Sequence, residues 1–202
     1  MAFKFDFQVA IADANFTVDY LEGCAPLTVE FENQSTGGTY LWNFGNNDTT
    51  STVFNPIRTY PTPGTYLVEL YIFNPASCNI WDTAFQYVTV HPAITADFDL
   101  VSTPCSNQVA FNDSSSVAPV SWLWYFDDGD SSVVQNPIHV YDTSGVYDVQ
   151  LIATNTFGCK DTTLVQVEIN LATTNISPND TICFQSNGTQ YPRWHSPVLY
   201  NL

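Results

Sequence analysis

Two stretches of this chain are copies of one pattern: residues 42–74 read WNFGNNDTTSTVFNPIRTYPTPGTYLVELYIFN, and residues 124–155 read WYFDDGDSSVVQNPIHVYDTSGVYDVQLIATN. Both contain W-x-F, then N-P-I-x-x-Y, then G-x-Y-x-V-x-L-x-x-x-N, at an offset of 82 residues that becomes 81. A repeat of this length is a whole small domain rather than a solenoid unit. The sequence therefore predicts two tandem domains.

Apolar and polar residues alternate in short runs that are rich in Val, Tyr, Phe and Thr and bounded by Gly, Pro, Asn and Asp. These runs lie at residues 27–31, 66–73, 85–90, 108–111, 146–153 and 164–169. Such runs indicate strands, and no stretch shows a helical period. The predicted fold class is all-β, with two tandem immunoglobulin-like antiparallel β-sandwiches. Trp42 and Trp124 are expected on central strands, packed in the two cores.

The repeat sets the expected domain boundaries. Residues 1–12 form an N-terminal extension strand, because Phe3, Phe5, Phe7 and Val9 alternate with polar residues. Domain 1 covers residues 13–91 and domain 2 covers residues 92–171. Residues 172–202 are an incomplete third β-segment or tail, of which 191–202 resemble nothing earlier in the chain. We expect the chain to be an excerpt of a longer protein.

The charge balance excludes two classes of partner. Four Lys and Arg face 20 Asp and Glu, which gives a formal net charge of −16. Nucleic-acid binding needs clustered cations, and so does adsorption to an anionic membrane surface. The chain also lacks an apolar run long enough to span a bilayer, so no membrane insertion is expected.

The cysteines are placed in register with the repeat. Cys24 matches Cys105, Cys78 matches Cys159, and both pairs are separated by 54 residues. This spacing predicts one disulfide per domain, Cys24–Cys78 and Cys105–Cys159, and hence an extracellular compartment. The alternative is four buried free thiols. Cys183 is left over and has no assigned role.

The shared residues resemble the PKD (polycystic kidney disease) domain, a β-sandwich module of extracellular proteins. The second copy is the closer match, because W-Y-F-D-D-G-D at 124–130 is similar to the family's W-x-F-G-D-G, whereas the first copy has Asn46 and Asn47 there. Tandem PKD domains with cysteines look like those of large secreted surface proteins of the Bacteroidetes group. The resemblance implies adhesion, carbohydrate or protein binding, or spacing, and it does not imply catalysis.

An acidic turn is the candidate calcium site. Asp127, Asp128 and Asp130, together with Gly129, offer oxygen ligands, although EF-hand spacing is absent. The alternative is a hairpin turn in which Asp and Gly serve backbone geometry. No other cofactor is expected. His139 aligns with Arg58, which argues against a ligand role, and no transition-metal spacing occurs.

Other candidate sites are weaker. Asn-x-Ser/Thr sequons give candidate glycosylation sites at Asn15, Asn33, Asn47, Asn112, Asn175, Asn179 and Asn187. Trp81 and Trp122 are candidates for stacking on sugars. Trp122 shares a face with Trp124, so packing is the expected role for it, whereas Trp81 stays open as a contact.

Three functional hypotheses follow. The first is a non-catalytic structural or adhesive module that acts as a rigid spacer at the cell surface or in a secreted protein. The second is a subunit that assembles head to tail into a fibre by strand exchange, in which partners are copies of itself or neighbouring β-domains. The alternative is a carbohydrate- or protein-binding accessory domain of a larger secreted enzyme, whose partners are glycans or surface proteins.

Overall fold

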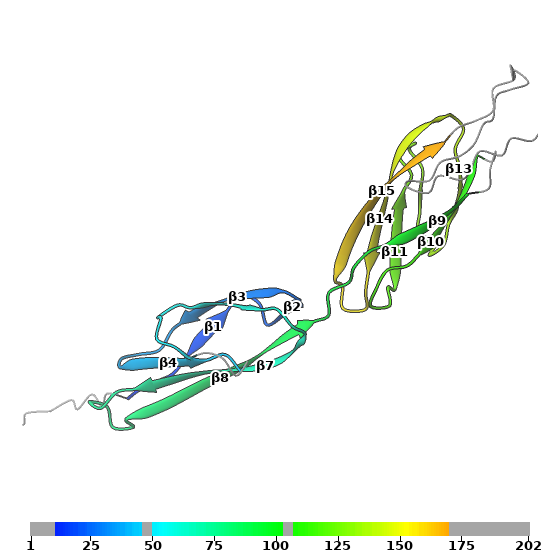
Figure 1. The fold of residues 1–202 in the computed structure, drawn as a ribbon. Helices are drawn as coiled ribbons and strands as arrows, with labels where there is room; N and C mark the ends of the chain where they lie inside the picture. The colour runs from blue at the N-terminus through cyan, green and yellow to red at the C-terminus, as the bar shows by residue number, and fades with distance from the viewer. Residues whose placement is uncertain (1–10, 46–49, 103–106, 170–202) are drawn as a thin grey trace, which may run out of the picture. The chain divides into compact units, whose positions relative to one another are not determined.

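The computed structural model describes residues 11–45, 50–102 and 107–169. The chain divides into two compact units, Met1–Ala93 (unit 1) and Ile94–Leu202 (unit 2), and Figure 1 shows the strands of each. The regular elements of the described residues are all strands, which confirms the all-β prediction. No helix among them is long and apolar enough to cross a membrane.

Unit 1 is a sandwich of two sheets (Figure 1). Its strands are β1 (Phe16–Val18), β2 (Glu22–Cys24), β3 (Leu27–Asn33), β4 (Thr39–Asn43), β5 (Thr50–Ser51), β6 (Ile57–Tyr60), β7 (Gly64–Phe73) and β8 (Trp81–His91). One sheet has the order β1-β3-β6, and the other has the order β2-β8-β7-β4-β5. The neighbours are antiparallel except β2 and β8, which are parallel.

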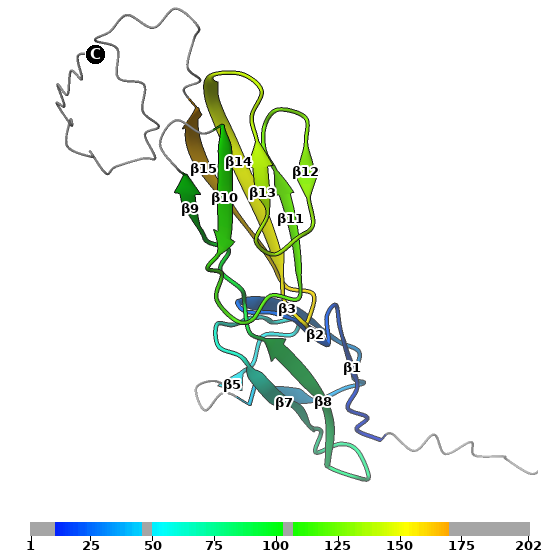
Figure 2. The same ribbon diagram turned by 90° about the vertical axis from the view of Figure 1, so that its right-hand side faces the viewer.

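Unit 2 repeats this architecture (Figure 2). Its strands are β9 (Phe98–Ser102), β10 (Gln108–Asp113), β11 (Ser121–Tyr125), β12 (Ser131–Ser132), β13 (Ile138–Val140), β14 (Gly145–Thr154) and β15 (Lys160–Ile169). The sheets have the orders β13-β10-β9 and β12-β11-β14-β15, and all pairs are antiparallel. The predicted sandwiches are thus confirmed.

The long strands show why the apolar pattern selects this fold. On β7 the side chains of Val68, Leu70 and Ile72 are fully buried, and the residues between them are only partly buried. Val149 and Leu151 occupy the same inward positions on β14. Because successive side chains of a strand point to opposite faces, alternation gives each sheet one apolar face, and the two faces form the core.

The repeated tryptophans lie at the centres of the cores, as predicted. Trp42 and Trp124 are both fully buried. The indole Nε1–H of Trp42 donates to the Val53 carbonyl at 3.0 Å, and that of Trp124 donates to the Val134 carbonyl at 2.9 Å. The only polar atom of each ring therefore has a partner, as a buried indole requires.

The G-x-Y motif also has a structural role in both units. The Tyr66 hydroxyl donates to the Thr62 carbonyl at 2.7 Å, and the Tyr147 hydroxyl donates to the Thr143 carbonyl at 2.9 Å. These bonds fix the chain just before β7 and β14, in the manner of the tyrosine corner of immunoglobulin-like sandwiches.

The predicted Cys24–Cys78 disulfide is wrong. Cys24 is disulfide-bonded, whereas Cys78 is an exposed free thiol. Cys24 lies beside His91 at the last residue of β8, while Cys78 lies before the first residue of that strand. At about 3.3 Å per residue, β8 separates them by roughly 33 Å, far beyond the roughly 7 Å that a disulfide allows between Cα atoms.

Several predictions fall outside the described residues. They concern Cys105 and Cys183, residues 1–10 of the extension strand predicted over residues 1–12, and the segment at 172–202. Cys159, the predicted partner of Cys105, is buried and disulfide-bonded.

Candidate functional sites

A hairpin turn and a short strand bring three titratable side chains together in unit 2. The turn connects β11 to β12 and contains Asp128 and Asp130. His139 is the middle residue of β13, which pairs with β10 in the other sheet, where Val109 is its neighbour. The cluster therefore links the two sheets of the sandwich.

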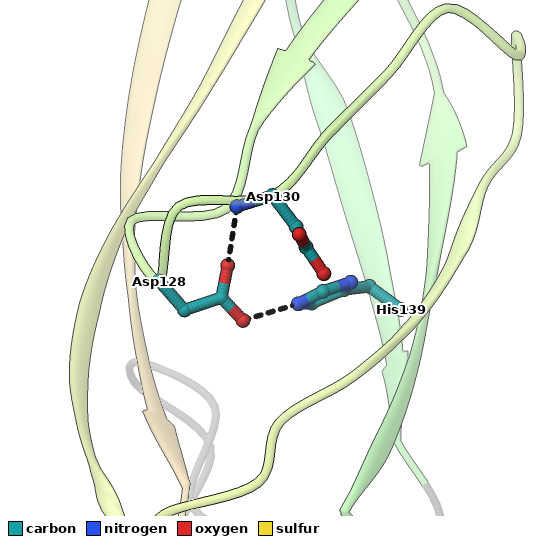
Figure 3. A group of neighbouring side chains, drawn as sticks. All are labelled: Asp128, Asp130 and His139. Carbon is teal, nitrogen blue, oxygen red and sulfur yellow. Dashed lines mark hydrogen bonds and ion pairs between the residues drawn. The ribbon is translucent and has the colours of Figure 1, made fainter.

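The three side chains converge, as Figure 3 shows. The imidazole Nε2 of His139 is 2.6 Å from Oδ2 of Asp128, and the other Asp128 oxygen accepts the Asp130 backbone N–H at 3.1 Å. One ligand atom from each of Asp128, Asp130 and His139 lies within 4.8 Å of the others. This group is called the Asp-Asp-His cluster below.

The imidazole is held by two aromatic rings. His139 is 8% exposed and stacks on Phe126, with the ring centroids 4.1 Å apart and the planes 4° apart. Tyr141 meets it edge-on, at 4.6 Å and 88°. These contacts fix the ring plane, so Nε2 faces the carboxylates without further rearrangement.

The electrostatics of Asp128 follow from this geometry. Burial by itself raises the pKa of a carboxyl group, but the hydrogen bond from His139 and the Asp130 amide favour the charged form. The net result is that the pKa of Asp128 lies below its ordinary value. The carboxylate is therefore ionised at neutral pH, and the imidazole N–H is the donor in their contact.

Asp127, the third predicted calcium ligand, does not join the cluster. Its φ is 66°, and its carboxylate accepts the Asp148 backbone N–H at 3.0 Å. In unit 1 the matching residue is Gly45, where a Cβ would lie 2.4 Å from the Leu67 carbonyl oxygen. The turn thus places Asp127 against the neighbouring strand, away from His139. The prediction of calcium at this turn is not tested by the structure.

The sequence predicts no ligand role for His139, because unit 1 has Arg58 at that position. The structure gives the substitution a different meaning. The Arg58 guanidinium carbon lies 5.8 Å from the ring centroid of Phe44, the residue that matches Phe126. Each unit therefore packs a nitrogen-bearing side chain against the matching phenylalanine. The two units differ because the side chain in unit 1 is an arginine, which always carries a positive charge.

A second candidate site is the outer face of the larger sheet in unit 1. Trp81, Phe85 and Tyr87 on β8 are 64%, 63% and 57% exposed. Trp81 packs on Phe73 of β7 at 4.3 Å. Beside this pair is a shallow hollow of about 470 Å³, lined by Thr39, Tyr40, Leu41, Thr52, Tyr71, Phe73 and Trp81. We call this surface the aromatic face.

The matching strand of unit 2, β15, which the structure describes along its whole length, does not carry these rings. The strand registers place Lys160 at the position of Trp81, Leu164 at that of Phe85 and Gln166 at that of Tyr87. The rings are therefore not needed to form a sheet of this shape. Trp122, the other predicted sugar contact, is partly buried against the core, and its indole N–H donates to Asp113 at 2.8 Å.

The sequon asparagines that the structure describes differ in their exposure to solvent. Asn15 and Asn112 are exposed, whereas Asn33 is 5% exposed and its side-chain oxygen accepts the Ser35 backbone N–H at 2.9 Å. The side-chain nitrogen of Asn33, to which a glycan would be attached, is buried. Asn47, Asn175, Asn179 and Asn187 lie outside the described residues.

Several solved structures resemble this chain. The PKD1 domain of the Vibrio cholerae metalloprotease PrtV is 29% identical, covers 38% of this chain and 96% of its own, and has a TM-score of 0.36. The PKD1 domain of Vibrio anguillarum Epp is 26% identical, with coverages of 40% and 96% and a TM-score of 0.37. Fibronectin(III)-like modules of Clostridium thermocellum CbhA are 12% identical, cover 77% and 94%, and have a TM-score of 0.41. A search of curated proteins finds no match.

Each of the two units matches a family model. Residues 15–85 match one model described as PKD domain, and residues 89–169 match another with the same description. PKD domains are immunoglobulin-like modules, typically extracellular and often parts of larger secreted proteins, and they are non-catalytic. With the two sandwiches and their repeated motifs, these matches show that the chain belongs to the PKD domain family and carries two such domains in tandem.

Proposed function

We propose that this chain is a non-catalytic extracellular module, a rigid spacer with an adhesive surface in a secreted or cell-surface protein of the Bacteroidetes type. The disulfide-bonded state of Cys24 and Cys159 supports an oxidising compartment. The aromatic face of unit 1 is the observation that favours adhesion over spacing alone.

A module that acts only as a spacer does not need exposed aromatic side chains. Large exposed apolar patches on soluble domains mark interaction sites, and Trp81, Phe85 and Tyr87 lie along one strand on a solvent-facing surface. In unit 2, the matching strand has polar or aliphatic residues at these positions. The family fold therefore does not require the rings, and ligand binding explains their presence.

The occupant we propose is a neutral polysaccharide. Ring faces suit the C–H surfaces of sugars, and Trp81 and Phe85 are four residues apart, about 13 Å along an extended strand. Polar groups lie on the same face, including Glu69, whose carboxylate accepts the Asn43 amide at 2.9 Å. A net charge of −16 opposes a polyanionic ligand, so a neutral glycan is the complementary choice.

The test is retention of the purified chain by neutral polysaccharides such as cellulose, chitin and xylan. We expect Trp81→Ala and Phe85→Ala each to weaken binding about tenfold, which corresponds to about 1.4 kcal/mol for each ring. Both side chains are exposed, so the unfolding temperature should not change.

The matched control is Leu164→Ala, which removes the exposed apolar side chain at the position of Phe85 in unit 2. It should leave retention unchanged. Equal retention of the wild type and the Trp81→Ala/Phe85→Ala double variant, or no retention on any of the polymers, would contradict the adhesive role. The same binding face also suits an accessory domain of a larger secreted enzyme.

One observation favours fibre assembly as a second function. The Thr89 N–H donates to the Leu21 carbonyl at 2.8 Å, on the side of β8 that faces away from β7. By the two-residue period, the N–H groups of Thr83, Phe85 and Tyr87 point to this same side, where β2 pairs only with Thr89–His91. Among the described residues, this edge is unpaired over Thr83–Tyr87, and unpaired edges accept added strands.

The donor we propose is the alternating segment at residues 3–9 of another copy. Negative-stain microscopy and light scattering should then show filaments, and Thr83→Pro should abolish them because proline removes an edge N–H. Thr162→Pro, the matched change in β15, should still assemble. Particles that remain monomeric at all concentrations would exclude strand exchange and leave the polysaccharide test unaffected.

A further inference from the structure

The Asp-Asp-His cluster has the ligands of a metal site, although the sequence contains no transition-metal spacing. Asp128 and Asp130 come from a turn in one sheet and His139 from the other sheet, so long-range folding unites them. The two carboxylates together carry a formal charge of −2, which favours an added cation.

The comparison between the units supports this conclusion. In unit 1 the side chain of Arg58 provides a permanent positive charge over Phe44. In unit 2 His139 takes that position over Phe126 and has carboxylates in front of it. A cation is thus built into one domain, while the other presents ligands for a cation from solution.

A neighbouring hydroxyl group gives an independent indication. Tyr141 is fully buried and touches His139 edge-on, and its hydroxyl has no hydrogen-bond partner among the described residues. In unit 1 the matching Tyr60 hydroxyl donates to the Phe44 carbonyl at 3.3 Å. A buried polar group without a partner is costly, and a bound water or ion beside the cluster would relieve that cost.

We propose that Asp128, Asp130 and His139 bind a borderline divalent ion of the zinc class, with water completing its coordination. On binding, the imidazole proton moves from Nε2 to Nδ1, so the ion takes the place of the hydrogen bond between His139 and Asp128. An imidazole ligand favours such ions over Ca²⁺, which takes oxygen ligands almost exclusively. The stacking on Phe126 orients the imidazole, and the Asp130 amide orients the Asp128 carboxylate. The ion would bridge the β11–β12 turn to β13 and lock the two sheets together at this point.

The experiment is a titration of the full chain with Zn²⁺ alone, followed by calorimetry and by the ¹⁵N resonances of the histidine rings. The chain should contain Cys78→Ser, so that the exposed thiol does not compete for zinc. We expect one ion per chain and a shift of the His139 resonance. Ca²⁺ at the same concentration should not shift that resonance.

Two variants make the result specific. His139→Arg recreates the arrangement of unit 1 and should keep the fold, while Asp130→Asn keeps the shape and removes a charge. Each should weaken zinc binding at least tenfold. His91→Ala, which removes a histidine of unit 1, is the matched control and should bind as the parent does. Unchanged affinity in His139→Arg, or an unshifted His139 resonance at saturating zinc, would overturn the proposal.

Discussion

Asp113 shows how one residue sets the acid response of a domain. Its carboxylate accepts hydrogen bonds from the Trp122 indole at 2.8 Å, the Gln135 amide at 3.2 Å and the Ser115 backbone at 3.1 Å. Burial by itself raises the pKa of Asp113, but these donors outweigh it, and the pKa lies below its ordinary value of 3.8. Unit 1 has Asn33 at this position, with the same bond to the backbone two residues on.

Asp113→Asn should therefore destabilise unit 2 in a pH-dependent way. Because folding lowers the pKa, the charge contributes stability that is complete above 3.8 and is lost as the pH falls through the folded value. Asparagine keeps an acceptor but not the charge, so we expect a loss of about 1 kcal/mol at pH 6, kept small by partial exposure. Urea unfolding of both chains at a series of pH values measures the difference.

The difference between the two chains should shrink as the pH falls below 3.8 and the wild-type carboxylate becomes protonated in the folded state as well. A difference of the same size at every pH would show that the asparagine acts through packing rather than through charge.

At the scale of elements, the alternation of apolar and polar residues is sufficient to predict which side chains point inward where the strands are long. β7 and β14 have enough alternating positions to define their inward faces, where Val68, Leu70, Val149 and Leu151 are buried. β13 contains only Ile138, His139 and Val140, and its apolar residues point outward while its histidine points inward. Ile138 is 63% exposed, whereas His139 is buried.

The orientation of β13 comes from its ladder with β10, where Val109 opposes His139. Pairing register is a long-range property, and a one-residue change would send every side chain of so short a strand to the other face. For this reason the acidic turn was visible in the sequence, while the third member of the Asp-Asp-His cluster was not. The aromatic face was likewise visible only through Trp81, because its other rings looked like ordinary strand residues.

At the scale of the molecule, the cysteines show what a repeat can and cannot reveal. The equal spacing of Cys24–Cys78 and Cys105–Cys159 reflects the repeat of one pattern along the chain. Any two repeated positions have equal spacing, so the observation says nothing about proximity. In the structure Cys78 is free and Cys159 is disulfide-bonded. The position of Cys159 is taken in unit 1 by Ile80, because the Asn74 N–H donates to the Ile80 carbonyl and the matching Asn155 N–H donates to the Cys159 carbonyl.

This difference predicts a selective chemical reactivity. In native protein without reductant, maleimide should label Cys78, because the thiol is exposed and unbonded. Cys24 and Cys159 should be labelled only after reduction and unfolding. Peptide mapping by mass spectrometry distinguishes the three positions, and Cys78→Ser should remove the native label without lowering the unfolding temperature. A native Cys24–Cys78 cross-linked peptide would instead require the two ends of β8 to approach each other, which this fold does not allow.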